Sequence, residues 1–243
     1  LARSNAELEQ FAYVASHDLQ EPLRKIQAFG DRLRSRCSES LPPEGVDYLQ
    51  RMHAAAGRMQ TLIRDLLAFS RVGTRGQPFV PVNLQRITEE VLGDMETRIE
   101  ETGARVSVEP LPEIEADPLQ MRQLMQNLLG NALKFRRPDL PPEIHISAHP
   151  AGQAAGSSLD TGWVIRVRDN GIGFDLKYLD RIFIPFQRLH DRSEYEGTGI
   201  GLAVCRKIVE RHGGTLTAES SPGNGATFIV YLPSNPGAQG VSL

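Results

Sequence analysis

The stretch that decides the fold is FAYVASHDLQEPLR, residues 11–24, with the adjacent pair His17-Asp18 at its centre. A histidine beside a carboxylate on a helix can act as a nucleophile, because the carboxylate holds one ring proton and the other nitrogen keeps a free lone pair. Apolar residues recur around the pair at three- and four-residue steps, which predicts one buried helical stripe. The stripe comprises Leu8, Phe11, Ala15, Leu19, Ile26, Phe29 and Leu33. His17 falls on the opposite side, so it suits either a nucleophile or an ordinary surface histidine.

Residues 1–72 predict two long helices and nothing else. The first runs from about Ser4 to Cys37, and Pro22 within it removes one helical hydrogen bond and should bend it. The second carries an apolar seam at alternating steps of three and four, made of Leu49, Met52, Ala56, Met59, Ile63 and Leu66. Because two helices cannot enclose a core alone, we expect a dimer in which two hairpins form a four-helix bundle.

The composition is typical of a globular protein and excludes several classes of function. The 243 residues are 40% hydrophobic and 23% charged, enough for one large domain or two small ones. A net charge of −3 predicts no nucleic-acid partner. No apolar run approaches the ~18 residues that span a membrane, and no signal peptide is visible. Two distant cysteines favour a reducing, cytoplasmic compartment, with neither a zinc site nor a disulfide framework.

Residues 73–78 have the composition of a short linker, and the pattern after them changes to mixed helices and strands. Strands are predicted at 79–82, 105–108, 144–147, 163–168, 215–219 and 226–231, and helices at 84–101, 118–135 and 199–211. Asp117 before Pro118 is a helix-start signal, and Gly213-Gly214 is a helix-stop signal. The mix predicts a two-layer α/β sandwich over residues 79–235, followed by a disordered tail at 236–243.

Three motifs in this second domain are typical of nucleotide binding. Asn127 and Asn131 share one helix face with Lys134 beyond them, where amide oxygens can ligate Mg²⁺ and a lysine can meet phosphate. Asp169-Asn170-Gly171-Ile172-Gly173 follows a strand, so its glycines let a ligand approach and its aspartate can accept from an amine. GTGIGL, residues 197–202, opens a helix whose bare amides can bind phosphate. Each motif alone also suits a structural interpretation: solvated asparagines, a tight turn or a plain helix start.

Together and in this order, the motifs resemble the histidine protein kinase core of two-component systems over residues 4–233. The wording of the first helix is similar to the phytochrome-linked and other soluble-sensor members. The matching segments are the phosphoacceptor motif at 16–19 with Pro22, the N box at 127–135, the first glycine box at 169–173, the phenylalanine box at 182–190 and the second glycine box at 197–202. The resemblance implies a helical hairpin forming a dimeric four-helix bundle, followed by the α/β ATP-binding fold shared with gyrases and chaperones.

The resemblance also implies a role for each site residue, with ATP and Mg²⁺ as the cofactors. His17 would be phosphorylated and Asp18 would accept its proton. Asn131 would ligate Mg²⁺ with support from Asn127, and Asp169 would recognise the adenine amino group. The nucleotide site is completed by Lys134, Gly171, Gly173, Arg188, Gly197, Thr198, Gly199, Gly201 and Leu202, with residues 175–198 as a mobile lid. The other histidines stand in scattered contexts that favour structural or surface roles.

The implied partners are a second copy of the chain, a response regulator that receives the phosphoryl group, and a sensor domain upstream, since the chain opens in mid-helix. The alternatives are an ATPase of the same fold, such as a gyrase- or chaperone-like machine, and a non-catalytic dimerisation scaffold. Related ATPases carry a water-activating glutamate where this chain has Asn127, a poor base. Glu21 stands where many members carry Thr or Asn, and its negative charge predicts weak phosphatase activity.

Overall fold

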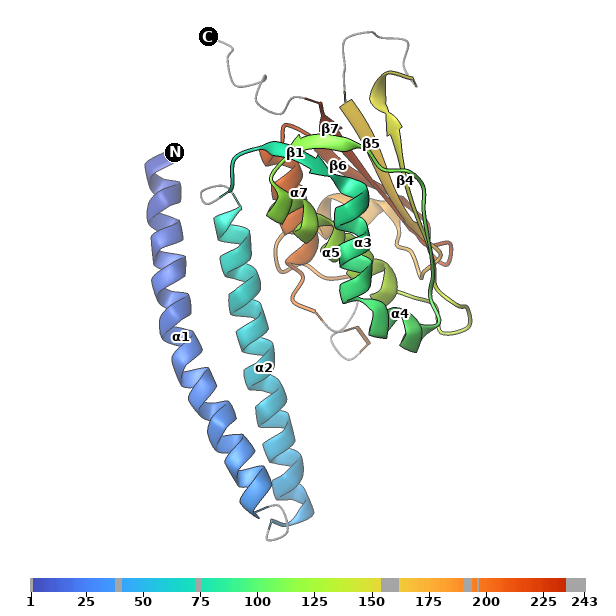
Figure 1. The fold of residues 1–243 in the computed structure, drawn as a ribbon. Helices are drawn as coiled ribbons and strands as arrows, with labels where there is room; N and C mark the ends of the chain where they lie inside the picture. Colours follow the sequence, from blue (N-terminus) through green and yellow to red (C-terminus); the bar gives the residue numbers. More distant parts are fainter. Residues whose placement is uncertain are drawn as a thin grey trace. The chain divides into compact units, whose positions relative to one another are not determined.

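The chain folds into two compact units, Leu1–Thr74 and Arg75–Leu243. The computed structural model describes residues 2–37, 41–72, 76–153, 162–189, 194–195 and 197–234, with side chains from Leu19 onward. The first unit is a helical hairpin and the second an α/β unit, as the sequence predicts (Figure 1). The predicted tail at 236–243 lies outside the described residues.

The hairpin consists of α1 (Ala2–Cys37) and α2 (Pro43–Arg71). Pro22 does not interrupt α1, which bows along its length (Figure 1). Pro43 opens α2, where its fixed φ suits the first helical position and its missing N–H costs no bond. The core of the unit is a small cluster in which Leu23 of α1 meets Ala56 and Ile63 of α2, with Leu67 packed against it.

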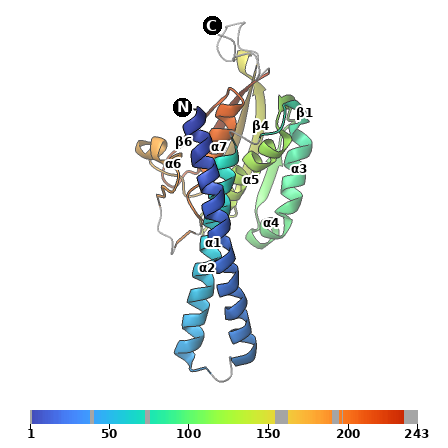
Figure 2. The ribbon, with the colours of Figure 1, turned by 90° about the vertical axis from the view of Figure 1, so that its left-hand side faces the viewer.

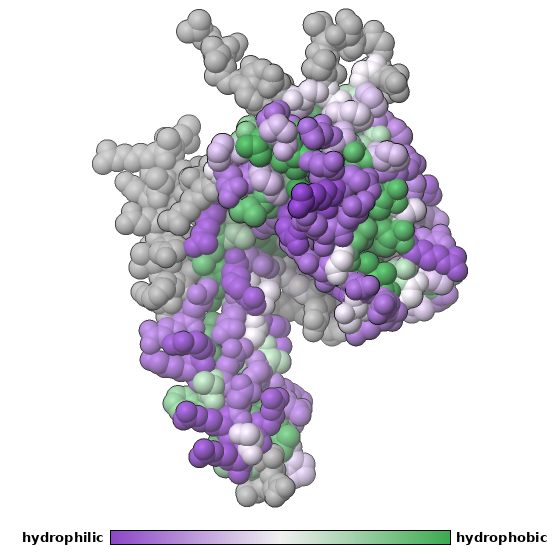
Figure 3. Space-filling view, in the orientation of Figure 1, coloured by the Kyte–Doolittle hydropathy of each residue, from purple (hydrophilic) through white to green (hydrophobic). Residues whose placement is uncertain are grey.

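The apolar stripe predicted on the first helix is exposed within one chain, so a single hairpin does not bury it. On α1, Phe29 is 61% exposed within one chain. On α2, the residues of the predicted apolar seam fall into two groups: Leu49, Ala56 and Ile63 are buried, whereas the methionines are exposed. The exposed seam comprises Leu19, Ile26, Phe29, Leu33, Met52 and Met59. Figure 3 shows hydrophobic residues standing among hydrophilic ones along the described hairpin. The side chains of Leu8, Phe11 and Ala15 lie outside those described.

The second unit is built on a five-stranded sheet with the strand order β2-β4-β5-β7-β6. β2 runs parallel to β4, and the other neighbours pair antiparallel. The strands are β2 (Arg105–Val108), β4 (Glu143–Pro150), β5 (Gly162–Asp169), β6 (Thr215–Ser220) and β7 (Ala226–Pro233). A separate antiparallel pair joins β1 (Val80–Asn83) to β3 (Glu113–Ala116). β3 was not predicted, because its four residues, two of them glutamates, are too few to show a clear alternation of polar and apolar side chains.

Three helices form the second layer on one face of this sheet: α3 (Leu84–Asp94), α5 (Pro118–Lys134) and α7 (Gly201–Arg211) (Figure 1 and Figure 2). Alternate strand residues such as Ile146, Val167 and Val230 point into the core, where they meet the buried faces of α5 and α7. The two-layer sandwich is therefore confirmed. In its helix layer the start of α7 lies beside Asn127 of α5 and the end of α7 beside Gln120, which positions the site.

The predicted helix over residues 84–101 is in fact two helices. α3 ends at Asp94, and α4 (Glu96–Thr102) follows a break at Met95, whose ψ of 4° is not helical. α4 ends at Gly103 with φ +63°, a left-handed cap that glycine adopts without steric cost. The helix predicted from Gly199 begins instead at Gly201, because Gly199 has φ +78° and cannot continue a right-handed helix. Short turns η2 (Ala151–Gln153), η3 (Leu176–Tyr178) and α6 (Leu179–Ile182) occupy the predicted loops.

Candidate nucleotide site and phosphoacceptor helix

Asp169, at the end of β5, presents a nearly buried carboxylate at one end of the site. Its Oδ1 accepts hydrogen bonds from the backbone N–H groups of Gly171 (2.8 Å) and Ala226 (3.2 Å). Burial raises the pKa of Asp169 to about 6, although the two backbone bonds favour the ionised form. Within the described residues no group donates to Oδ2, so this second oxygen can accept from a ligand.

The glycines that follow Asp169 allow close packing of the loop against its neighbours. A Cβ on Gly171 would lie 2.3 Å from the carbonyl oxygen of Phe135, and one on Gly173 would lie 2.2 Å from that of Ser221. The Ile172 N–H donates to the Phe135 carbonyl at 2.9 Å. These glycines were predicted to admit a ligand, whereas the close approach that the structure shows is to the end of α5 and to the β6–β7 turn. The loop is thereby fixed beside the N box.

The asparagine face of α5 meets the glycine loop, although the two motifs are far apart in the sequence. Asn127 lies beside the start of α7, since a Cβ on Gly201 would lie 3.0 Å from Asn127 Oδ1. A Cβ on Gly197 would lie 2.9 Å from Lys134 Nζ. Gly197 and Gly201 therefore stand where a side chain would fill the space between α5 and α7.

Lys134 is the centre of a cationic cluster beside Gly197. Burial, as the largest cause, and the like charges of the neighbouring Arg188 and Arg98 together lower its pKa to about 8. Its Nζ lies 4.1 Å from the centroid of the Phe135 ring, a cation–π distance. Arg98 was not predicted, because it belongs to no motif and lies on α4, within a stretch that the sequence shows only as amphipathic.

Arg188 and Tyr195 organise the segment before the glycine loop. The Arg188 guanidinium donates to the carbonyl oxygens of Gly197 and Tyr195. The Tyr195 ring lies 5.2 Å from the Phe135 ring, a contact between aromatic residues that the sequence motifs did not indicate. Thr198 Oγ1 accepts from the N–H of Ile200 at 3.4 Å just before α7 begins. His190 of the predicted phenylalanine box lies outside the described residues.

This donor set fits a nucleotide with a divalent ion. A buried carboxylate at one end suits an exocyclic amine, while Lys134, Arg188 and the amides at the start of α7 suit phosphates at the other. Asn131, one turn after Asn127 on α5, is half-buried and offers an amide oxygen of the kind that Mg²⁺ accepts. The structure thus brings the predicted residues of all three motifs into one region.

The phosphoacceptor candidates belong to the other unit. His17 and Asp18 lie within α1, one turn before Pro22, and their side chains are outside those described. Glu21 is exposed on the same helix and its Oε1 lies 2.7 Å from Lys25 Nζ. This lysine reduces the local negative charge that the sequence alone assigned to the position.

None of the helices in the described part of the chain has both the length and the apolarity needed to cross a bilayer.

Comparison with known proteins matches both units. Residues 7–75 fit the family model of the His Kinase A (phospho-acceptor) domain, and residues 116–236 fit that of the histidine kinase-, DNA gyrase B- and HSP90-like ATPase. Cyanobacterial phytochrome A of Nostoc sp. strain PCC 7120 is 45% identical over 96% of this chain and 29% of its own length. Phytochrome-like protein Cph1 of Synechocystis sp. strain PCC 6803 is 42% identical over 96% of this chain and 30% of its own.

The structural comparison agrees in fold. Full-length ShkA, solved in complex with AMPPNP, superposes with a TM-score of 0.69 at 24% identity over 93% of this chain and 47% of that one. The chain spans about 30% of the length of the curated relatives named above. With a phosphoacceptor domain followed by an ATPase domain, and with relatives 45% and 42% identical over 96% of its length, the chain belongs to the histidine kinases of two-component systems and comprises their catalytic core.

Proposed function

We propose that the chain is an ATP-dependent histidine autokinase that phosphorylates His17 and hands the phosphoryl group to an aspartate of a response regulator. The observation that carries the proposal is the proximity of Lys134 and Asn127 to Gly197 and Gly201, which brings a cation, an amide and the glycine loop together between α5 and α7. The family of both domains supports it.

The nucleotide would lie between Asp169 and the glycine loop. Asp169 Oδ2 would accept from the adenine amino group, since Oδ1 is already used by the backbone. Lys134, Arg188 and the amides from Gly197 to Leu202 would hold the phosphates. Asn131 would ligate Mg²⁺, and Asn127, beside Gly201, would support it from the preceding turn.

The chemical step needs little more from the protein than position and one proton acceptor. Bound ATP supplies the γ-phosphoryl group. A ring nitrogen of His17 attacks the γ-phosphorus as its bond to the bridging oxygen of ADP breaks, and Asp18 takes the proton from the other ring nitrogen. Asn127 is neutral at the position where related ATPases carry the base that activates water. Transfer of the phosphoryl group to His17 is therefore favoured over hydrolysis of ATP.

The exposed seam of the hairpin supports a homodimer. Large apolar side chains such as Phe29 and Leu33 stay exposed on α1, and Met52 and Met59 on α2. Covering such a seam against its copy completes the four-helix bundle. We also place a response regulator and an upstream sensor domain among the partners, and the free cysteines Cys37 and Cys205 are in keeping with a cytoplasmic setting.

Incubation with γ-labelled ATP tests the proposal. The unmodified protein should acquire acid-labile, base-stable label, and His17→Gln should lose it while binding ATP with unchanged affinity. His53→Gln is the matched control, since this histidine also lies on the hairpin, with its Nε2 3.3 Å from Asp31 Oδ1. Release of free phosphate without protein label would favour an ATPase, and neither product would favour a scaffold.

A further inference from the structure

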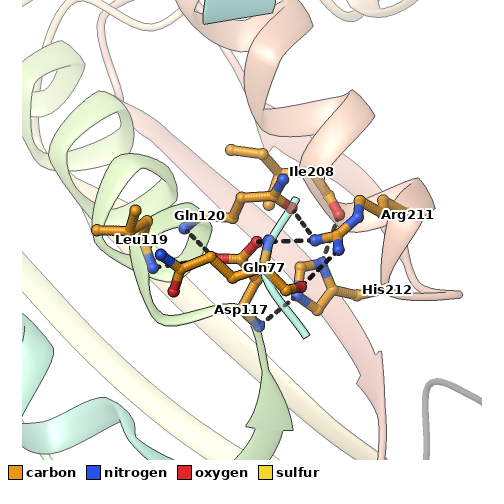
Figure 4. A network of polar contacts seen from close by, with 7 residues as sticks. All are labelled: Gln77, Asp117, Leu119, Gln120, Ile208, Arg211 and His212. Atoms are coloured by element: carbon orange, nitrogen blue, oxygen red, sulfur yellow. Dashed lines mark hydrogen bonds and ion pairs between the residues drawn. The ribbon is translucent and has the colours of Figure 1, made fainter. Parts of the chain in front are cut away.

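A buried polar cluster ties the first residues of the ATP-binding unit to α5 and α7. We call it the linker clasp and define it by Gln77, Asp117, Gln120, Arg211 and His212 (Figure 4). Asp117 is only 1% exposed. Its Oδ1 caps α5 by accepting from the N–H groups of Leu119 and Gln120, while Oδ2 accepts from the Gln77 N–H at 2.6 Å and from Arg211 Nη1 at 3.0 Å.

Arg211, the last residue of α7, completes the grip on Gln77. Its Nη1 also donates to Gln120 Oε1 at 2.8 Å, and its Nη2 donates to the Gln77 carbonyl at 2.7 Å. Both backbone polar groups of Gln77 are therefore held by charged side chains. A Cβ on Gly76 would lie 2.0 Å from Arg211 Cζ, so the chain passes directly over the guanidinium.

His212 and Phe79 close the cluster from the other side. The backbone N–H of Asp117 donates to His212 Nε2 at 3.0 Å, and Nδ1 lies 2.7 Å from the Ile208 carbonyl, so Nδ1 carries the proton. The Phe79 ring lies 4.6 Å from the His212 ring and 4.8 Å from Arg211 Cζ. Gly76 and Phe79, on either side of Gln77, are thus also in contact with the linker clasp.

The linker clasp holds the segment of chain that connects the two family domains, so it can affect how they are joined. Residues 76–79 lie between the two matched family domains, 7–75 and 116–236. With the clasp closed, the covalent connection after Val72, the C-cap of α2, runs through residues 73–76. With the clasp open, it runs through residues 73–79, as far as the start of β1 at Val80. The clasp therefore sets the length of chain that joins the ATP-binding unit to the phosphoacceptor hairpin.

We propose that Asp117 and Arg211 are positioning residues for autophosphorylation, because by holding Gln77 they fix the length and the starting point of this connection. The inference rests on the proposed autokinase function. Effective concentration falls roughly as the −3/2 power of tether length, so releasing residues 77–79 lowers it about twofold before any loss of orientation. The nucleotide site is not part of the clasp, so the loss should appear in kcat and not in the KM for ATP.

Three variants of the full chain test the connection between the two units, either by weakening the hold on Gln77 or by lengthening the connection. Arg211→Lys keeps a cation beside Asp117 but loses the second guanidinium nitrogen, which donates to the Gln77 carbonyl. Gly76→Ala pushes a methyl group against the guanidinium from the linker side. Insertion of Gly-Ser between Gly76 and Gln77 lengthens the connection with the clasp intact. Arg206→Lys is the matched control, since this arginine of α7 is exposed and pairs with Glu210, and a lysine keeps the positive charge that Arg206 places near the Phe183 ring.

The measurements are incorporation of γ-label at His17 over a range of ATP concentrations, ATP affinity by calorimetry, and hydrogen exchange at the Gln77 amide. We expect Arg211→Lys and Gly76→Ala to speed Gln77 exchange, and all three variants to lower kcat about twofold or more with ATP affinity and KM unchanged. The control should match the unmodified protein.

Two results would overturn the inference. One is faster Gln77 exchange with kcat equal to that of the control, which makes the clasp purely structural. The other is a loss of ATP affinity that accounts for the loss of rate, which assigns the effect to α7 and the nucleotide site. The unmodified protein is measured first, and if it takes no label the proposed function fails and this inference fails with it.

Discussion

ATP binding to this chain should take up protons between about pH 7 and pH 9 because of Lys134. The lysine is half-buried near Arg188 and Arg98, and these surroundings lower its pKa to about 8. Phosphates placed against the ammonium offset the like charges and return the pKa toward the ordinary value of 10.5. The nucleotide therefore prefers the protonated lysine and draws a proton onto a neutral one.

The magnitude follows from these two values. A change of pKa from about 8 to 10.5 corresponds to an uptake of ~0.1 proton per ATP at pH 7, ~0.5 at pH 8 and ~0.9 at pH 9. The same linkage weakens ATP binding up to about tenfold from pH 7 to pH 9. Because part of the lysine surface remains in water, screening reduces the coupling, and we expect a weakening of about three- to tenfold.

Calorimetric titration of the full chain with ATP at constant Mg²⁺ measures the effect. At each pH the experiment is repeated in buffers of different ionisation enthalpy, and the dependence of the heat on the buffer gives the protons taken up. Lys134→Met should lose the uptake at high pH and show weaker binding at neutral pH. Lys25→Met is the matched control, because Lys25 is an exposed lysine of the hairpin paired with Glu21. Equal uptake in Lys134→Met and the unmodified protein would refute the reasoning.

Four further predictions concern single side chains. Asp169→Asn should weaken ATP binding about tenfold or more yet raise the melting temperature at neutral pH: the raised pKa of about 6 means that this carboxyl favours folding only when protonated, and the benefit is lost as pH rises through 6. A variant with unchanged ATP affinity in calorimetry would move the adenine contact elsewhere. Asp117→Ala should cost about 3–5 kcal/mol in urea unfolding, because it leaves Arg211 without its buried partner, and a loss below 1 kcal/mol, about that of a surface pair, would contradict this. Phe29→Glu in a fragment of residues 1–72 should give a helical monomer in light scattering where the unmodified fragment is a dimer, and a dimeric variant would count against the exposed seam as the interface. Glu21→Thr should speed decay of the phosphorylated regulator, by less than an unpaired carboxylate would imply because Lys25 already offsets the charge, and an unchanged decay rate would dismiss the electrostatic argument.

The features that the sequence alone determined are those governed by local chemistry. Asp117 accepts from the N–H groups of the next turn, and Gly103 adopts a left-handed cap, because both choices depend only on residues within a few positions. The order of the motifs likewise sufficed to identify the family, since each motif is a continuous stretch that can be recognised without knowing which distant residues it contacts. The hairpin followed from helical periodicity in the same way.

Only the tertiary structure decided which distant residues meet. Arg98 lies near enough to Lys134 to lower its pKa, and α3 and α4 are separated by a break at Met95, but no local pattern marks either feature. The stripe at Phe29 has the periodicity of a buried face, but periodicity cannot say whether the cover comes from the same chain or a second copy. Gln77 looks like linker by composition, yet Asp117 and Arg211 hold its backbone from positions 40 and 134 residues away. Contacts of this kind arise from packing of whole layers, which the order of residues along the chain does not reveal.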